Sequence, residues 1–223
     1  MLSIEVHREV TKMSKNTWTY NKVFKWAFRI LSLCFTIICM ILNKNGEYSI
    51  HVTSGFLMVI SSFGPDLLAT VLKLNLSNAL DFFIQFFIML ALVLGRLLNL
   101  YSILPWWDLF LHLLSGVLIG IIALAQLHLV VGDETFKKLP PFFVWLFVTL
   151  ASIAGAALWE FWEFAGDQLL GFDSQLNSLV DTMTDMIMGT ISGLLIASAS
   201  YINVKFNKFK FLNGFINGFI RKK

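Results

Sequence analysis

The stretch WWDLFLHLLSGVLIGIIALAQLHLVV, residues 106–131, decides the fold class, because Asp108 is its only Asp, Glu, Lys or Arg. A helix needs about 20 apolar residues to cross a hydrocarbon core roughly 30 Å thick. Comparable stretches occupy 24–42, 48–64, 79–100, 142–167 and 181–202. The sequence therefore predicts an all-α, polytopic membrane helix bundle of six spans. The second span is expected to end at Gly64-Pro65-Asp66, since proline disfavours helix at the preceding residue.

The composition of the whole chain agrees with this class. Its 223 residues are 57% hydrophobic and 14% charged, against about 25% charged residues in soluble domains, which excludes an ordinary soluble protein. The net charge of +3 is too small and too dispersed to indicate nucleic-acid binding. Cys34 and Cys39 share one apolar run and are expected to be packing residues. The expected partners are membrane lipids and a lipid-linked or small-ion substrate, and the oligomeric state stays open.

Basic residues predict the orientation of the spans. With the N-terminus inside, 15 of the 17 Lys and Arg residues fall on the cytoplasmic side, and only Lys44 and Arg96 fall outside. Because short cytoplasmic loops retain Lys and Arg, we expect a multi-pass cell-membrane protein with both termini cytoplasmic. Its parts are a cytoplasmic segment 1–23, a transmembrane domain 24–202 and a basic, aromatic tail 203–223. Asp66 and Asp81 are expected to be interfacial or cap-like residues.

Acidic residues gather on the other side. Eight of the 14 carboxylates fall in the predicted outer half, and seven of these lie in or between the last three spans. Residues three or four apart share one helix face, which defines three stripes: Asp108 with His112, Glu160 with Glu163 and Asp167, and Asp181 with Asp185. Alternating helix directions bring the stripes to the same depth. Small residues such as Gly116 and Gly189 allow close helix approach.

Carboxylates this close need compensation, because neighbouring like charges disfavour ionisation. Carboxylates with one imidazole suit a divalent ion such as Mg²⁺, Mn²⁺, Zn²⁺ or Fe²⁺. The predicted ligands are Asp108, His112, Glu160, Glu163, Asp181 and Asp185. Asp167 is predicted as a supporting carboxylate or general base, and Arg96 as a group that neutralises an anionic headgroup. A protonated or salt-bridged network without metal, and independent interfacial charges, remain alternatives.

Three segments carry a family resemblance. The segments WDLFLHLLSG (107–116), WEFWE (159–163) and DTMTD (181–185) resemble those of the YjdF-like family of small bacterial membrane proteins, over residues 25–200. This resemblance implies a membrane fold and site positions, but no particular reaction. The order of the motifs is also faintly similar to that of VanZ-like membrane proteins. The spacing of Asn177, Asp181 and Asp185 resembles the magnesium motif of intramembrane prenyltransferases, but the chain lacks a second copy.

Three functions stay open at this stage. The first is a metal-dependent membrane enzyme acting on a lipid or lipid-linked substrate. The second is an ion or proton-coupled transporter, since intramembrane carboxylates and histidines line such pathways. The third is a non-catalytic sensor or assembly factor whose metal or proton site is structural.

Overall fold

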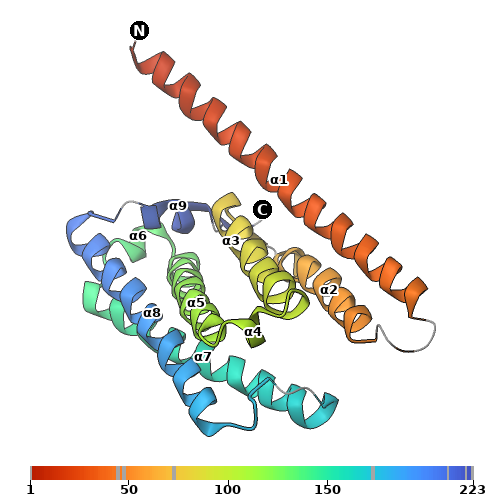
Figure 1. Cartoon of the computed structure of the whole chain (residues 1–223). Coiled ribbons are helices and arrows are strands. Elements are labelled where there is room, and N and C mark those ends of the chain that lie inside the picture. Colours follow the sequence, from red (N-terminus) through yellow and green to blue (C-terminus); the bar gives the residue numbers. More distant parts are fainter. Residues whose placement is uncertain are drawn as a thin grey trace. The chain divides into compact units, whose positions relative to one another are not determined.

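The computed structural model describes residues 2–43, 46, 49–71, 74–171, 174–209, 211–218 and 220–221. Apart from two strands of two residues each, it is all-helical (Figure 1). The elements in chain order are α1 (Leu2–Leu42), α2 (Ser49–Val71), β1 (Leu74–Asn75), α3 (Asn78–Ile88), η1 (Met89–Leu97), α4 (Leu100–Ile103), α5 (Trp107–Val131), α6 (Asp133–Phe136), α7 (Pro141–Leu170), α8 (Leu179–Phe206), α9 (Phe211–Gly218) and β2 (Ile220–Arg221). Lys44 lies outside the described residues, and so do Glu47 and Asp173, which are two of the eight carboxylates predicted in the outer half.

Six helical segments are long and apolar enough to cross a membrane, which confirms the predicted multi-pass bundle. They are Lys22–Leu42, His51–Val71, Asn78–Leu97, Trp107–Val131, Pro141–Leu169 and Leu179–Phe206. The third span combines α3 with η1, a nine-residue π-helix that carries Arg96. Which side of the membrane each terminus occupies stays a prediction.

The predicted end of the second span at Gly64-Pro65-Asp66 is wrong, because α2 continues through Pro65 to Val71. Proline removes a backbone donor and disturbs the preceding turn. In the turn before Pro65, side chains of neighbouring helices add hydrogen bonds to the backbone: the Ser62 carbonyl accepts from Arg29 Nη2 (2.7 Å) and from Gln85 Nε2 (2.9 Å). Such contacts let a spanning helix tolerate an internal proline.

The chain divides into two compact units, Met1–Leu98 and Asn99–Lys223. In the first unit, α1, α2 and α3 share an ion-pair network. Lys25 Nζ lies 3.0 Å from Asp66 and 2.7 Å from Asp81, and Arg29 Nη2 lies 2.7 Å from Asp66. Neither carboxylate is a helix cap, since Asp66 lies inside α2 and Asp81 lies in the first turn of α3, whose N-cap is Ser77. That the two residues are interfacial stays a prediction.

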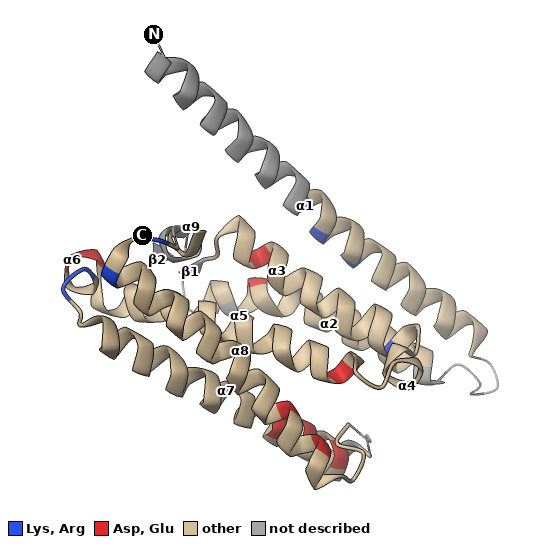
Figure 2. Cartoon of the chain, turned by 60° about the vertical axis from the view of Figure 1, so that its left-hand side comes forward, with Lys and Arg blue, Asp and Glu red and all other residues tan. Residues whose placement is uncertain are grey.

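In the second unit α5, α7 and α8 pack against one another, and α9 packs on α5 (Figure 1). Acidic residues lie where α7 ends and where α8 begins, and basic residues lie toward the opposite ends of these helices (Figure 2). A Cβ on Gly116 would lie 2.1 Å from the carbonyl oxygen of Gly189, and one on Gly193 would lie 2.2 Å from Cβ of Ser152. Only glycine permits these contacts, so the glycines set the helix separations.

Candidate metal centre

The ends of three helices of the second unit supply the site. Asp108 lies in the first turn of α5, Asp181 lies in the first turn of α8, and Glu160 precedes the last turns of α7. The close contact of Gly116 with Gly189 joins α5 and α8 one turn from His112 and one turn from Asp185. The local packing of glycine therefore places these two side chains beside each other.

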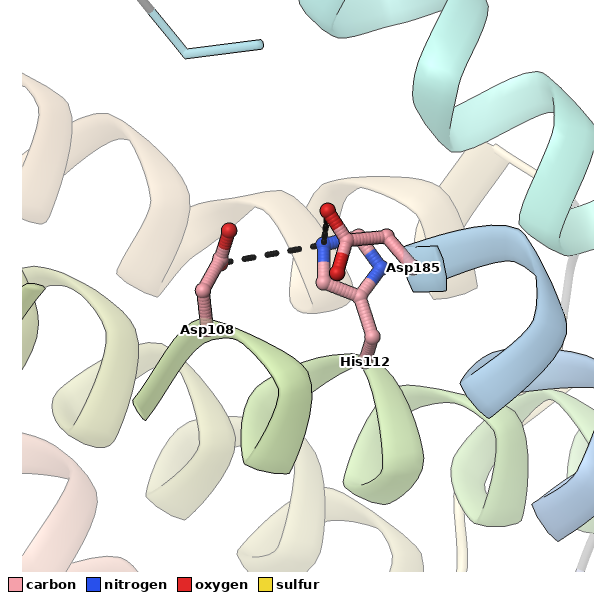
Figure 3. A group of neighbouring side chains, drawn as sticks. All are labelled: Asp108, His112 and Asp185. Atoms are coloured by element: carbon pink, nitrogen blue, oxygen red, sulfur yellow. Dashed lines mark ion pairs between the residues drawn. The ribbon is translucent and has the colours of Figure 1, made fainter. Parts of the chain in front are cut away.

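His112 is central to the group (Figure 3). Its Nε2 atom lies 3.7 Å from Asp108 Oδ1 and 3.7 Å from Asp185 Oδ2, and its Nδ1 atom lies 3.9 Å from Glu160 Oε1. His112 is 5% exposed, while Glu160 and Asp185 are each 2% exposed. These separations exceed hydrogen-bond length, so His112 is not directly hydrogen-bonded to any of the three carboxylates.

Around His112, two buried carboxylate oxygens lack a hydrogen-bond partner among the described residues: Glu160 Oε1 and Asp185 Oδ1. Burial without a partner is costly for any polar atom and more so for a charged one. Within the second unit, no described Lys or Arg lies within 4.0 Å of the Glu160 or Asp185 carboxylate. The compensation must therefore come from protons or from a bound cation.

Two groups of potential ligands meet at His112. One contains Asp108, His112 and Asp185, and the other contains His112, Glu160 and Glu163; within each group the ligand atoms lie within 4.8 Å of one another. We call these five residues the His112 cluster. The helix-face spacing thus correctly predicted which stripes would converge. Asp181, a sixth predicted ligand, stands one turn before Asp185 and belongs to neither group found among the described residues.

A loop residue that sequence reasoning missed supports the cluster. Gln175 Nε2 donates to Glu160 Oε2 at 3.0 Å and to the Glu160 carbonyl at 3.2 Å. Asp167 holds that loop, because its two carboxylate oxygens accept the backbone N–H groups of Ser174 (2.8 Å) and Gln175 (3.0 Å). An isolated glutamine between helices gives no sequence signal of such a contact. Trp159 Nε1 similarly donates to Glu163 Oε1 at 3.0 Å.

The two residues predicted as catalytic have different surroundings. Asp167 is engaged by backbone donors of its own loop, an arrangement that suits a positioning role. Arg96 belongs to the first unit, where its Nε donates to Ser54 Oγ at 3.1 Å. A catalytic role for either side chain stays a prediction.

The donor set fits a hard or borderline divalent cation. Carboxylate oxygens with one imidazole nitrogen suit Mn²⁺, Fe²⁺ and Zn²⁺, and Mg²⁺ favours the oxygens. The described cysteines, Cys34 and Cys39, lie in α1 of the other unit. The cluster therefore could hold a metal through oxygen and nitrogen, and it offers no thiolate.

Fold and site together define a six-span helical membrane protein with a buried carboxylate–imidazole cluster. The chain belongs to the family described as "Predicted membrane protein (DUF2238)", which matches residues 24–205. The resemblance to the YjdF-like family is confirmed, since YjdF is a member of this family. No curated protein and no solved structure matches the chain.

Proposed function

We propose that this protein binds a divalent cation at the His112 cluster and uses it as a membrane enzyme on a lipid or lipid-linked substrate. The observation that carries the proposal is the pair of buried carboxylates beside one imidazole, Glu160 and Asp185, each of which has an oxygen without a hydrogen-bond partner. Both carboxylates are 98% buried, and a cation between such groups removes the cost of their burial.

Each nitrogen of His112 has a distinct task in this proposal. Nε2 faces Asp108 and Asp185, so these three residues are the proposed ligands. Nδ1 faces Oε1 of Glu160, and the other carboxylate oxygen of Glu160, Oε2, accepts a hydrogen bond from Gln175. A metal-bound histidine commonly donates its second N–H to a carboxylate, which fixes the tautomer and the ring orientation. Three protein ligands leave a position open for substrate, as catalytic metal sites require.

Packing beside the cluster favours an enzyme over a transporter. A transporter needs a polar path to the opposite face. A Cβ on Gly120 would lie 2.9 Å from Ile196 Cβ, and one on Gly155 would lie 2.8 Å from Ile119 Cγ2. The Ser152 hydroxyl, which lies in this region, donates to the Val148 carbonyl of its own helix. This packing supports a site that opens on one side only.

The surroundings of α7 favour a lipid substrate. Trp159, Phe161 and Trp162 flank Glu160 and Glu163 in the sequence, and Trp162 is 71% exposed. Tryptophan prefers the level of the lipid headgroups. A phosphate or ester near a headgroup would therefore lie at the depth of the cluster. A divalent ion there would polarise a phosphoryl or carbonyl oxygen.

Metal analysis of the purified protein tests the binding proposal. We expect stoichiometric Zn²⁺ or Mn²⁺ in the wild type, its loss in Asp185→Asn, which removes a proposed ligand, and a reduced content in Glu160→Gln, which weakens the partner of His112 Nδ1. Asp133→Asn is the matched control, since Asp133 is an exposed carboxylate of the same unit that pairs with Lys137. Equal metal content in all four proteins, or none in a folded wild type, would overturn the proposal.

A second measurement separates catalysis from a structural metal. The metal-loaded wild type would be incubated with a short-chain phosphatidic acid and a short-chain phosphatidylglycerol, and released phosphate and lipid products would be quantified. We expect turnover that requires the metal and disappears in Asp185→Asn. Metal binding without turnover on either lipid would point to the sensor or assembly role instead.

A further inference from the structure

A groove opens between α7 and α8 at the ends of these helices remote from the His112 cluster. Its walls are Phe142 and Trp145 of α7 together with Ser198, Tyr201 and Ile202 of α8, and its volume is about 340 Å³. The lining is almost entirely apolar, and the groove is open along one side. A groove of this shape in a spanning segment suits an extended hydrocarbon chain.

Hydrogen bonds and ring stacking shape the walls. The rings of Phe142 and Trp145 stack with centroids 5.7 Å apart and planes 21° from parallel. Trp145 Nε1 donates to Ser198 Oγ at 3.4 Å, which joins the two helices across the groove. The aromatic wall is therefore held by contacts within the unit and needs little rearrangement to receive a ligand.

A positive charge stands beside the groove. Lys205 Nζ donates to the Tyr201 hydroxyl at 3.2 Å and lies 5.4 Å from the centroid of the Tyr201 ring. The Lys205 side chain is exposed, and no described carboxylate lies within 4.0 Å of its ammonium group. The apolar groove therefore borders Lys205, whose positive charge is not paired with a carboxylate in the described part of the chain.

We propose that this groove binds a phospholipid with a net negative headgroup, with one acyl chain between α7 and α8 and the phosphate at Lys205. The Tyr201 hydroxyl can donate to the phosphate when Lys205 turns toward it. Basic residues that border spanning helices attract anionic lipids. The unpaired positive charge of Lys205 beside an apolar groove favours an anionic phospholipid over a zwitterionic one. This site is separate from the metal centre and does not depend on it.

Quenching of tryptophan fluorescence by brominated lipid tests the proposal. The full-length protein would be placed in phosphatidylcholine vesicles in which either phosphatidylglycerol or phosphatidylcholine carries bromine on its acyl chain. The contribution of Trp145 is the difference in quenching between the wild type and Trp145→Phe. We expect brominated phosphatidylglycerol to quench Trp145 with an apparent affinity about fivefold higher than that of brominated phosphatidylcholine, as a single lysine near an anionic lipid provides.

Two lysine variants show whether the preference belongs to the groove. Lys205→Gln should abolish it and Lys205→Arg should keep it. Lys208→Gln, an exposed lysine outside the groove lining, should leave it unchanged and also reports on folding. Equal quenching by both lipids in the wild type would overturn the proposal. Equal losses in Lys205→Gln and Lys208→Gln would also overturn it, since they would indicate diffuse attraction to the membrane surface.

Discussion

Replacement of Gly116 by Ala should separate α5 from α8 at the point that positions the metal ligands. The new Cβ would lie 2.1 Å from both the Gly189 carbonyl oxygen and Ser192 Oγ. Real Cβ atoms essentially never approach other heavy atoms closer than 3.0 Å. Because one obstructing atom is backbone, the helices must move apart by about 1 Å, since packed interiors have no spare space.

The size of the effect follows from two opposing contributions. Overpacking a tight core costs about 1–3 kcal/mol, and the upper end applies where backbone obstructs. Alanine returns up to about 1 kcal/mol over glycine inside a helix. We therefore expect the free energy of unfolding to fall by about 2 kcal/mol. A shift of about 1 Å also exceeds the tolerance of roughly 0.2 Å on metal–ligand distances, so metal affinity should fall by about 10- to 100-fold.

Gly189→Ala is the control, because Gly189 is the partner of Gly116 in the α5–α8 contact but its own Cβ would point to space that tolerates a methyl group. Its Cβ would lie 3.2 Å from Ala156 Cβ and 3.6 Å from the His112 carbonyl oxygen, which small adjustments accommodate. Unfolding in mixed micelles of increasing SDS content would compare both variants with the wild type, and metal titration would compare affinities. If Gly116→Ala and Gly189→Ala gave the same stability and the same affinity, the reasoning from glycine contacts would be refuted.

Three further predictions concern ion pairing and metal. Arg29→Met should lower the free energy of unfolding by about 1–3 kcal/mol, because it leaves its polar partners in the first unit unsatisfied. In SDS unfolding, the double variant Arg29→Met/Asp66→Asn should recover part of this loss. Unchanged stability of Arg29→Met would contradict the prediction. A hydrogen bond from Lys137 holds the pKa of Asp133 below its usual range. This ion pair stabilises the folded state at pH values above the pKa that Asp133 has in the unfolded chain, and the stabilisation is lost as the pH falls through the pKa of Asp133 in the folded protein. Lys137→Met should therefore raise the pKa of Asp133 measured by NMR titration. Zn²⁺ at 100 times its Kd should stabilise the wild type by about 2.7 kcal/mol, and a chelator should reverse this without affecting Asp185→Asn.

Apolar length made the spans predictable from the sequence. Each stretch is too long and too apolar for a soluble helix, and all six appear as helices in the structure. The end of the second span was not predictable from local preference at Pro65, because α2 continues to Val71. Arg29 and Gln85 of neighbouring helices bind the Ser62 carbonyl in the turn before Pro65, and such packing against other helices is not visible to a local rule.

The His112 cluster was predictable to the extent that it depends on helix periodicity. Asp108 and His112 share a face by spacing alone, and so do Glu160 and Glu163. Gln175 lies on a loop whose path depends on the two bonds that Asp167 accepts. No periodicity describes such a path, so the partner of Glu160 emerged only from the three-dimensional arrangement.

The spacing inside the His112 cluster bears on how its charge is compensated. An imidazolium that donates to a carboxylate approaches it to about 2.7–2.9 Å. His112 Nε2 instead lies 3.7 Å from an oxygen of Asp108 and 3.7 Å from an oxygen of Asp185. Ligands about 2.1 Å from a tetrahedral ion lie roughly 3.4 Å from one another. His112 Nε2 is therefore too far from both carboxylates for a charge-assisted hydrogen bond, but its distances to them are close to those between two ligands of one ion. This comparison favours a bound cation over a salt bridge between a protonated His112 and these two carboxylates, and Gly116 fixes the distance between α5 and α8 on which it depends.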